Sequence, residues 1–211
     1  HEGDKFAFDK LNSPEAVNTF FKTVFPDFYE MVPTVAEAWE DHPLSNLAII
    51  RCSPWTNGKV ALMGDAAHAT VPFYGQGMNA GFEDCTVLSN LMKKHNENWV
   101  AIFEEYSRER KPDGDALQDL SLDNYYVMRD YVSDPEFLLR KKIEAKFSEL
   151  YPKKWLPLYS QVTFSNIRYS VAYQQGKKQS DIMDIIMQIP NIENVWDSGT
   201  VMNEMKVLSK D

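Results

Sequence analysis

VALMGDAAHATVPFYGQGMNAGFEDC, residues 60–85, carries the most informative structural pattern of the chain. It begins with an apolar run of strand length, Val60–Met63. A glycine-bearing segment, residues 64–77, interrupts that run, and a helical pattern begins near Met78. Glycines allow a ligand to approach the backbone closely, and a helix start offers free N–H groups with a partial positive charge. This order of strand, glycine loop and helix start predicts an anion or cofactor site.

The predicted helix after the loop has one apolar face. Its members recur at steps of three and four residues: Phe82, Cys85, Leu88, Leu91 and Met92. Acidic residues near its start and basic residues near its end suit the helix dipole. The chain's two cysteines show neither a disulfide framework nor a metal-ligand spacing, so we expect Cys85 to be a buried free thiol. This cysteine usage fits a reducing compartment.

The composition excludes several classes of protein. The 211 residues are 44% apolar and 13% aromatic, which is enough for a packed core and unlike a disordered chain. The net charge of −9, without a block of Lys or Arg, argues against a nucleic-acid-binding surface. No run of 18 apolar residues occurs, so the sequence predicts no ordinary membrane-spanning helix.

Cap and turn residues mark the elements of the first part of the chain. Ser13 followed by Pro14 predicts a helix start, with a hydroxyl cap before a proline at the first helical position. Residues 46–52 and 59–63 are predicted strands. The Asn-Gly pair at residues 57–58 favours a tight turn between them, so we expect a hairpin or a crossover.

The second half of the chain is predicted to be mostly helical. From Asn98 the pattern is helical, and Pro112 together with Gly114 predicts a kink or break. A second helix is expected at about residues 115–132, and a third from 134 to about 150.

Two features of this half leave alternatives open. Asn124 lies in the apolar stripe of the second helix, and a buried amide left unpaired costs about 1–3 kcal/mol. It therefore either bonds a neighbouring element or faces a cavity that holds a polar ligand. Isoleucines of the tail recur at helical spacing: Ile182, Ile185, Ile186 and Ile189. They either dock on the domain or lie on a membrane surface, and docking is the simpler prediction.

The stretch quoted first resembles the second flavin-binding motif of the class A flavoprotein aromatic hydroxylases. GDAAH at Gly64–His68 and PFYGQGMNAGFEDC at Pro72–Cys85 carry the resemblance, and the kynurenine-hydroxylating members of that family are the most similar. FLLRKKIEAKF at Phe137–Phe147 and PLYSQVTFSNIRYS at Pro157–Ser170 agree with it. The resemblance covers most of residues 40–175.

The resemblance implies an α/β fold class, here as an α+β fragment. The chain would be the C-terminal part of an FAD/NAD(P)-binding flavin hydroxylase fold with a largely helical C-terminal region. Three parts are implied: the end of a substrate-side sheet domain (1–57), the C-terminal part of the FAD-binding domain (58–111) and a helical domain that covers the substrate pocket (112–211). Such enzymes hold the ADP part of FAD on an N-terminal GxGxxG strand–turn–helix. That motif does not occur here, so we expect the missing N-terminal part of a longer enzyme as a partner.

The resemblance also implies an activity. It is the hydroxylation of L-kynurenine to 3-hydroxykynurenine with FAD and NADPH as cofactors, O₂ as co-substrate and a flavin hydroperoxide as oxygen donor, in tryptophan catabolism and NAD biosynthesis. A place on the cytosolic face of the mitochondrial outer membrane is implied as well. Two other functions stay open: a different flavin hydroxylase or epoxidase, and a non-catalytic helical interaction domain.

The cofactor residues follow from the motif. Asp65, just past the strand, would hold the ribityl chain of FAD. The helix start at Gly77, Met78 and Asn79 would aim its N–H groups at the pyrimidine edge of the flavin. His68 is interpreted as part of the strand-end turn rather than as a base, because no nucleophile arrangement accompanies it. No metal-ligand spacing is present, so no metal is expected.

The remaining site residues are assigned by the same resemblance. A wall over the flavin ring that excludes solvent would consist of Pro72, Phe73 and Tyr74. The substrate would be contacted by Asn124, Met128 and Tyr159. For Tyr159 the alternative is a tyrosine packed in the core.

Overall fold

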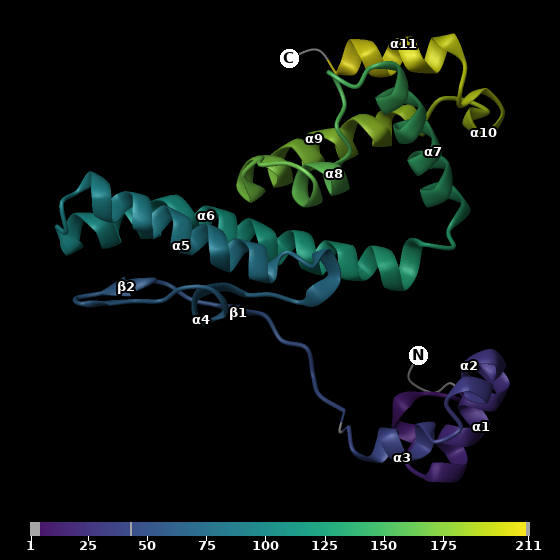
Figure 1. The fold of residues 1–211 in the computed structure, drawn as a ribbon. Coiled ribbons are helices and arrows are strands. Elements are labelled where there is room, and N and C mark those ends of the chain that lie inside the picture. Colours follow the sequence, from purple (N-terminus) through teal and green to yellow (C-terminus); the bar gives the residue numbers. More distant parts are fainter. Residues whose placement is uncertain (1–4, 43, 210–211) are drawn as a thin grey trace. The chain divides into compact units, whose positions relative to one another are not determined.

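The computed structural model describes residues 5–42 and 44–209, and the chain divides into two compact units, residues 1–47 and 48–211 (Figure 1). The first unit contains a short 3₁₀ turn and three helices: η1 (Phe8–Lys10), α1 (Pro14–Val24), α2 (Pro26–Met31) and α3 (Val35–Glu40). Ser13 caps α1, since its side chain accepts a hydrogen bond from the Ala16 amide at 3.3 Å, and the predicted helix start is confirmed.

The second unit carries the motif. Its strands are β1 (Ile50–Arg51), β2 (Thr56–Asn57) and β3 (Val60–Ala61). Its helices are α4 (Asp65–His68), η2 (Pro72–Tyr74), α5 (Gly77–Lys94), α6 (Trp99–Tyr126), the π-helical turn η3 (Val127–Tyr131), α7 (Pro135–Leu150), α8 (Leu158–Thr163), α9 (Tyr169–Ile186), α10 (Ile192–Val195) and α11 (Gly199–Leu208). The long helices α5 and α6 lie side by side, with α4 and the β2–β3 hairpin along one side of the pair (Figure 1).

The predicted strands are shorter than expected and pair differently. β2 and β3 form an antiparallel hairpin across Gly58, which adopts a φ of +59°, so the Asn-Gly turn is confirmed. The prediction that residues 46–52 form a strand is wrong before Ile50. Ile50 and Arg51 instead bridge to Ala69 and His68, at the end of the GDAAH motif. The strand is short because only these residues meet a backbone partner within the described part of the chain.

The predicted break at Pro112 and Gly114 is wrong, because α6 runs continuously through both residues. An interior proline removes one helix hydrogen bond, and tertiary contacts on both sides of it offset the loss. Arg110 pairs with Asp84 of α5. Gly114 serves close packing instead of a break, since a Cβ there would lie 2.8 Å from the ring of Trp55.

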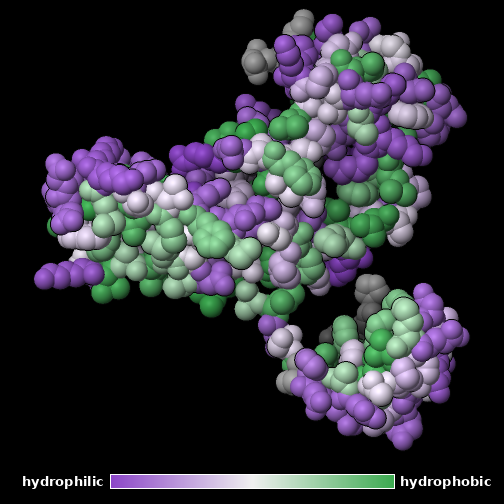
Figure 2. All heavy atoms as spheres, in the orientation of Figure 1, coloured by the Kyte–Doolittle hydropathy of each residue, from purple (hydrophilic) through white to green (hydrophobic). Residues whose placement is uncertain are grey.

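The buried face of α5 differs from the predicted one. Phe82 is 64% exposed and Cys85 is also exposed, so the expectation of a buried thiol is wrong. Leu91 is buried as predicted, and Ala80 and Asp84 are buried in place of the other two. Hydrophobic periodicity missed this arrangement because a charged residue, paired with Arg110, occupies the centre of the inner face. Figure 2 shows apolar residues, in green, on the exposed side of the second unit where α5 lies.

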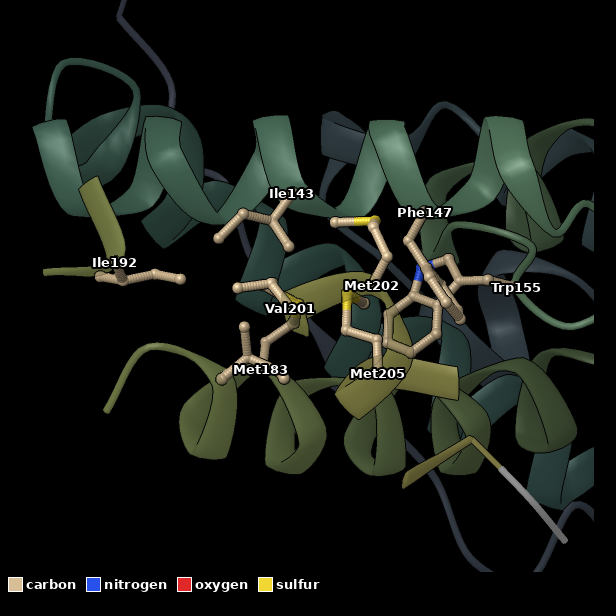
Figure 3. Close-up of a cluster of buried hydrophobic side chains, with 9 residues drawn as sticks. Ile143, Phe147, Trp155, Met183, Ile192, Val201, Met202 and Met205 are labelled. Carbon is tan, nitrogen blue, oxygen red and sulfur yellow. The ribbon is translucent and has the colours of Figure 1, made fainter. Parts of the chain in front are cut away.

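The tail docks on the domain, as predicted. Ile186 is fully buried, and Ile182 and Ile189 pack on the same apolar cluster. Figure 3 shows side chains of α7, α9 and α11 pointing toward one another in that cluster, with Trp155 at one end. The burial of such side chains, each contributing about 1.5–3 kcal/mol, holds the C-terminal helices together. No helix among the described residues has both the length and the apolarity needed to cross a membrane.

Candidate functional site

A groove lies between the end of the β3 segment and the start of α5. It has a volume of about 520 Å³, and much of its lining is glycine: Gly64, Gly75, Gly77 and Gly81, with Asp65 and Pro72 beside them. Glycine leaves the backbone amides and carbonyls open to a ligand. The segment predicted from sequence to approach a cofactor therefore borders an open groove that the protein's own side chains leave free.

The start of α5 presents free amides to this groove. Its first intrahelical hydrogen bond is donated by the Ala80 amide to the Gln76 carbonyl at 2.9 Å. The amides of Gly77, Met78 and Asn79 precede that bond, so helix geometry leaves them without an intrahelical acceptor. Gly77 and Met78 line the groove, and the side chain of Asn79 donates to Gln76 Oε1 at 2.9 Å. The three residues predicted to bind the cofactor lie together, with a partial positive charge at their end of the helix.

Asp65 is exposed and lines the same groove as the first residue of α4. The residue before it, Gly64, has φ +57° and ψ −139°, a backbone conformation that residues with side chains rarely adopt. The Asp65 carboxylate is therefore carried on a turn that requires glycine. A carboxylate in this place can accept hydrogen bonds from the hydroxyls of a ligand.

His68 is buried and belongs to the scaffold of the motif. Its Nε2 donates to Asp84 Oδ2 at 2.7 Å, because the carboxylate can only accept. Its ring packs on Trp55, with 5.2 Å between the ring centroids. These contacts leave His68 away from the groove and agree with its interpretation as part of the turn.

A second, larger cavity of about 780 Å³ lies among α6, α7, α8 and α9. Among the residues that line it are Asn124, Val127, Tyr74 and Tyr159. Two of the three predicted substrate contacts, Asn124 and Tyr159, thus come from distant parts of the sequence to one cavity.

For Asn124 the sequence left two alternatives open, a bond to a neighbouring element or a position facing a cavity, and both hold. Its Nδ2 donates to the carbonyl of Phe73 at 2.8 Å, which ties α6 to the η2 loop, and its side chain also lines the cavity. Met128, one turn further along, receives a weaker contact from the same Nδ2 at 3.8 Å to its sulfur. Met128 is half-exposed and lies outside the lining of the cavity.

Tyr159 is not a core residue. Its side chain is 51% exposed, and its ring stacks on Tyr74 with 5.6 Å between centroids and 24° between planes. Burial raises the pKa of the Tyr74 hydroxyl to about 12, so that hydroxyl stays neutral at physiological pH and can donate a hydrogen bond. The alternative that Tyr159 packs in the core is wrong.

Charged residues also line this cavity. Arg140 pairs with Asp184, and Lys141 donates to Glu144 at 2.8 Å. Lys177 lies over the Tyr173 ring, 4.1 Å from its centroid. Helical spacing places Arg140 and Lys141 opposite the apolar face of α7, and only the packing of α9 against α6 turns that side toward a cavity.

The groove fits the flavin part of FAD. Its lining offers free backbone N–H groups for an electron-rich ring edge, a carboxylate for hydroxyl groups and glycines where a ring would approach. Within the part of the chain that the structure describes, no cluster of three metal-ligating side chains occurs.

The sequence was compared with known families and curated proteins. The model of the FAD binding domain family matches residues 30–121. A kynurenine 3-monooxygenase of Flavobacterium johnsoniae is 46% identical over 205 residues, which are 97% of this chain and 46% of that protein. The chain is similar to kynurenine 3-monooxygenases over nearly its whole length. Its Christiangramia forsetii relative of the same name is 45% identical over 96% of this chain and 45% of that protein.

More distant relatives agree. A kynurenine 3-monooxygenase of Myxococcus xanthus is 38% identical over 90% of this chain and 41% of that protein. The chain thus spans somewhat less than half the length of the curated relatives it matches. The comparison thus shows similarity to these monooxygenases and a match to the FAD binding domain family.

Proposed function

We propose that the whole protein containing this chain hydroxylates the aromatic ring of L-kynurenine to 3-hydroxykynurenine, using FAD, NADPH and O₂. FAD would supply the redox and oxygen chemistry when bound, and an N-terminal part of the protein would hold the rest of the cofactor. The names of the relatives and the FAD-binding family support this proposal.

One observation carries the proposal: a single turn, η2, separates the groove from the cavity. Pro72 lines the groove and Tyr74 lines the cavity, and both belong to the three-residue turn η2. A flavin ring in the groove and an aromatic substrate in the cavity would therefore meet at this turn. Short separation between reacting groups is what a monooxygenase site requires.

The η2 turn is held in place on both sides. The Phe73 ring packs on Tyr125 with 4.8 Å between centroids, and the Phe73 carbonyl accepts the bond from Asn124. The Tyr74 ring is buried against Tyr159. We propose that this wall, Pro72 to Tyr74, keeps water from the reacting atoms.

The cavity suits an aromatic amino acid. Tyrosine rings offer apolar packing for an arene, while the amide of Asn124 and the hydroxyls of Tyr74 and Tyr159 offer hydrogen bonds. We propose that Asn124 and Tyr159 bind the amino-acid end of kynurenine and that Met128 acts through its contact with Asn124.

The location at the mitochondrial outer membrane stays a prediction. Its support is the resemblance alone, and the relatives named above come from bacteria.

Kynurenine-stimulated NADPH oxidation by the whole protein, with chromatographic detection of 3-hydroxykynurenine, tests the proposal. We expect stoichiometric product with L-kynurenine and none with L-tryptophan or anthranilate. Asn124→Ala should raise the KM for kynurenine, while Asn90→Ala, on the exposed side of α5, should leave it unchanged. A flavin-containing protein that hydroxylates another ring would favour the alternative of a different hydroxylase or epoxidase. A protein without flavin would leave only a non-catalytic interaction domain.

A further inference from the structure

We propose that Asp84 is a positioning residue for the flavin groove. Its buried carboxylate fixes the Gly64 backbone, on one wall of the groove, to the first turns of α5, on the other wall. This inference rests on the proposed flavin site and adds residues that lie outside the groove itself.

Asp84 is 0% exposed and accepts three hydrogen bonds. Its Oδ2 accepts the amide of Gly64 at 3.0 Å and Nε2 of His68 at 2.7 Å. Its Oδ1 accepts Nε of Arg110 at 2.7 Å. Burial alone would raise the Asp84 pKa, but these donors outweigh it and the pKa lies below its usual value, so the carboxylate stays charged. A single ionised group thus holds the turn before Asp65, the end of α4 and α6.

Arg110 completes the connection to the second wall. Its guanidinium is almost fully buried, and Nη2 donates to the carbonyl of Ala80 in the first turns of α5 at 3.2 Å. Its Nη1 pairs with Glu83, also on α5, at 3.0 Å. Arg110 therefore neutralises Asp84 and grips the helix segment whose amides face the groove.

The same ionic chain continues toward the substrate cavity. Asp113 accepts Nη1 of Arg110 at 3.3 Å and Nε of Arg168 at 2.9 Å. Its Oδ1 also accepts the amide and hydroxyl of Ser170, at 3.1 and 2.6 Å, at the start of α9. Because α9 forms one wall of the cavity, the groove and the cavity are both supported by this one connected set of ion pairs.

The position of Gly64 matters because Asp65 follows it directly. Gly64 holds a backbone conformation that few residues adopt, and such conformations persist only where surrounding contacts fix them. The Asp84 carboxylate supplies that contact from inside the protein. Without it the Asp65 carboxylate would lose its fixed distance from the α5 amides, and both are proposed to contact FAD.

Titration of the apo form of the whole protein with FAD, followed by quenching of flavin fluorescence, tests the inference. We expect Asp84→Asn to raise the Kd for FAD about tenfold and to change the visible circular dichroism of bound flavin, at a temperature where far-UV circular dichroism shows a folded protein. Glu105→Gln is the matched control. Glu105, near the start of α6, accepts Lys94 Nζ from the end of α5 at 2.6 Å, away from the groove. The Glu105→Gln variant should have a lower Tm and an unchanged Kd for FAD.

A second variant keeps the test valid if Asp84→Asn does not fold. Removing one partner of a buried ion pair leaves an uncompensated charge, whereas removing both is far better tolerated. Asp84→Asn combined with Arg110→Gln should therefore fold and still bind FAD about tenfold more weakly. A wild-type Kd in either folded variant would overturn the inference and leave the proposed function standing. A wild-type protein with no measurable affinity for FAD would overturn the proposed function itself.

Discussion

Replacing Gly114 by alanine should destabilise the protein, although alanine is the better helix former. Gly114 lies inside α6 where that helix crosses the motif. An added Cβ would lie 2.8 and 2.9 Å from two ring carbons of Trp55 and 3.1 Å from the Cβ of His68. Ordinary carbon–carbon contact is about 3.5–4.0 Å, so the ring and the helix must separate by about 1 Å.

The surroundings of Trp55 oppose that movement. The indole is 1% exposed and packs on Tyr106 as well as on His68, with ring centroids 6.1 and 5.2 Å away. Overpacking of such a site costs about 1–3 kcal/mol, while the change from glycine to alanine in a helix contributes about 0.5–1 kcal/mol in the other direction. The net loss for Gly114→Ala is therefore at most about 2.5 kcal/mol, with a midpoint of about 1 kcal/mol.

Gly176→Ala is the matched comparison. Gly176 lies inside α9, so the gain in helix propensity is the same, but the three atoms nearest to its added Cβ all belong to the flexible Leu158 side chain, with Cδ2, Cδ1 and Cγ at 2.6, 2.8 and 3.1 Å. That side chain borders the cavity and has room to turn. The difference between the two variants isolates the packing cost at Trp55, which we expect to be about 1–3 kcal/mol.

Thermal unfolding of the two variants measures this difference. A packing cost of about 2 kcal/mol corresponds to a Tm roughly 4–8 °C lower for Gly114→Ala than for Gly176→Ala in a unit of this size. Hydrogen exchange of the α6 amides, followed by mass spectrometry, should show faster exchange around Gly114 in the first variant only. Equal Tm values, or a Gly114→Ala protein more stable than wild type, would refute the packing argument.

Three further predictions concern the sites and the ion pairs. Asp65→Ala should weaken FAD binding about tenfold at an unchanged Tm, because the side chain is exposed and lines the groove; an unchanged flavin spectrum and Kd would remove Asp65 from the site. Tyr159→Phe should raise the KM for kynurenine about five- to tenfold and leave the Kd for FAD unchanged, with equal effects on both as the contrary result. Hydrogen bonds from Lys94 and His95 lower the pKa of Glu105 from 4.5 to about 2. Because the folded-state pKa is the lower one, the stabilisation is present above pH 4.5 and is lost as the pH falls toward 2. The Tm difference between wild type and Glu105→Gln should therefore shrink between pH 6 and pH 3, and a constant difference would count against it.

The motif and its immediate surroundings could be predicted from the sequence because they depend on local chemistry. Glycines at 64, 75 and 77 and the pattern after Met78 indicated a loop that leads into a helix start, and the groove lies there. The cap at Ser13 could also be predicted, and its side chain accepts a hydrogen bond from the amide three residues later.

Features that depend on tertiary packing could not be predicted. Phe82 was assigned to the wrong side of α5 and the buried position of Asp84 was missed, because hydrophobic periodicity cannot anticipate a guanidinium that neutralises a buried carboxylate. Pro112 and Gly114 likewise predicted a break, because the tertiary contacts around them are not visible in the sequence. Helix propensity reflects only the local cost of proline and glycine. The contacts of Arg110 and Trp55 with other elements stabilise α6 as one continuous helix.

The residues proposed to contact the substrate lie between these cases. Asn124 was conspicuous as an amide in an apolar stripe, but only the structure shows that it bonds Phe73 and lines a cavity at once. Tyr159 depended on resemblance, because nothing in its local sequence distinguishes a half-exposed ring stacked on Tyr74 from a core tyrosine.

The central claim is that the amides opening α5, together with Asp65, bind a flavin. A crystal structure of the whole protein grown with FAD tests it most directly. The account predicts the isoalloxazine edge within hydrogen-bond distance of the Gly77–Asn79 amides, with the ribityl hydroxyls on the Asp65 carboxylate. A flavin bound elsewhere, with this groove filled by protein side chains, would contradict it.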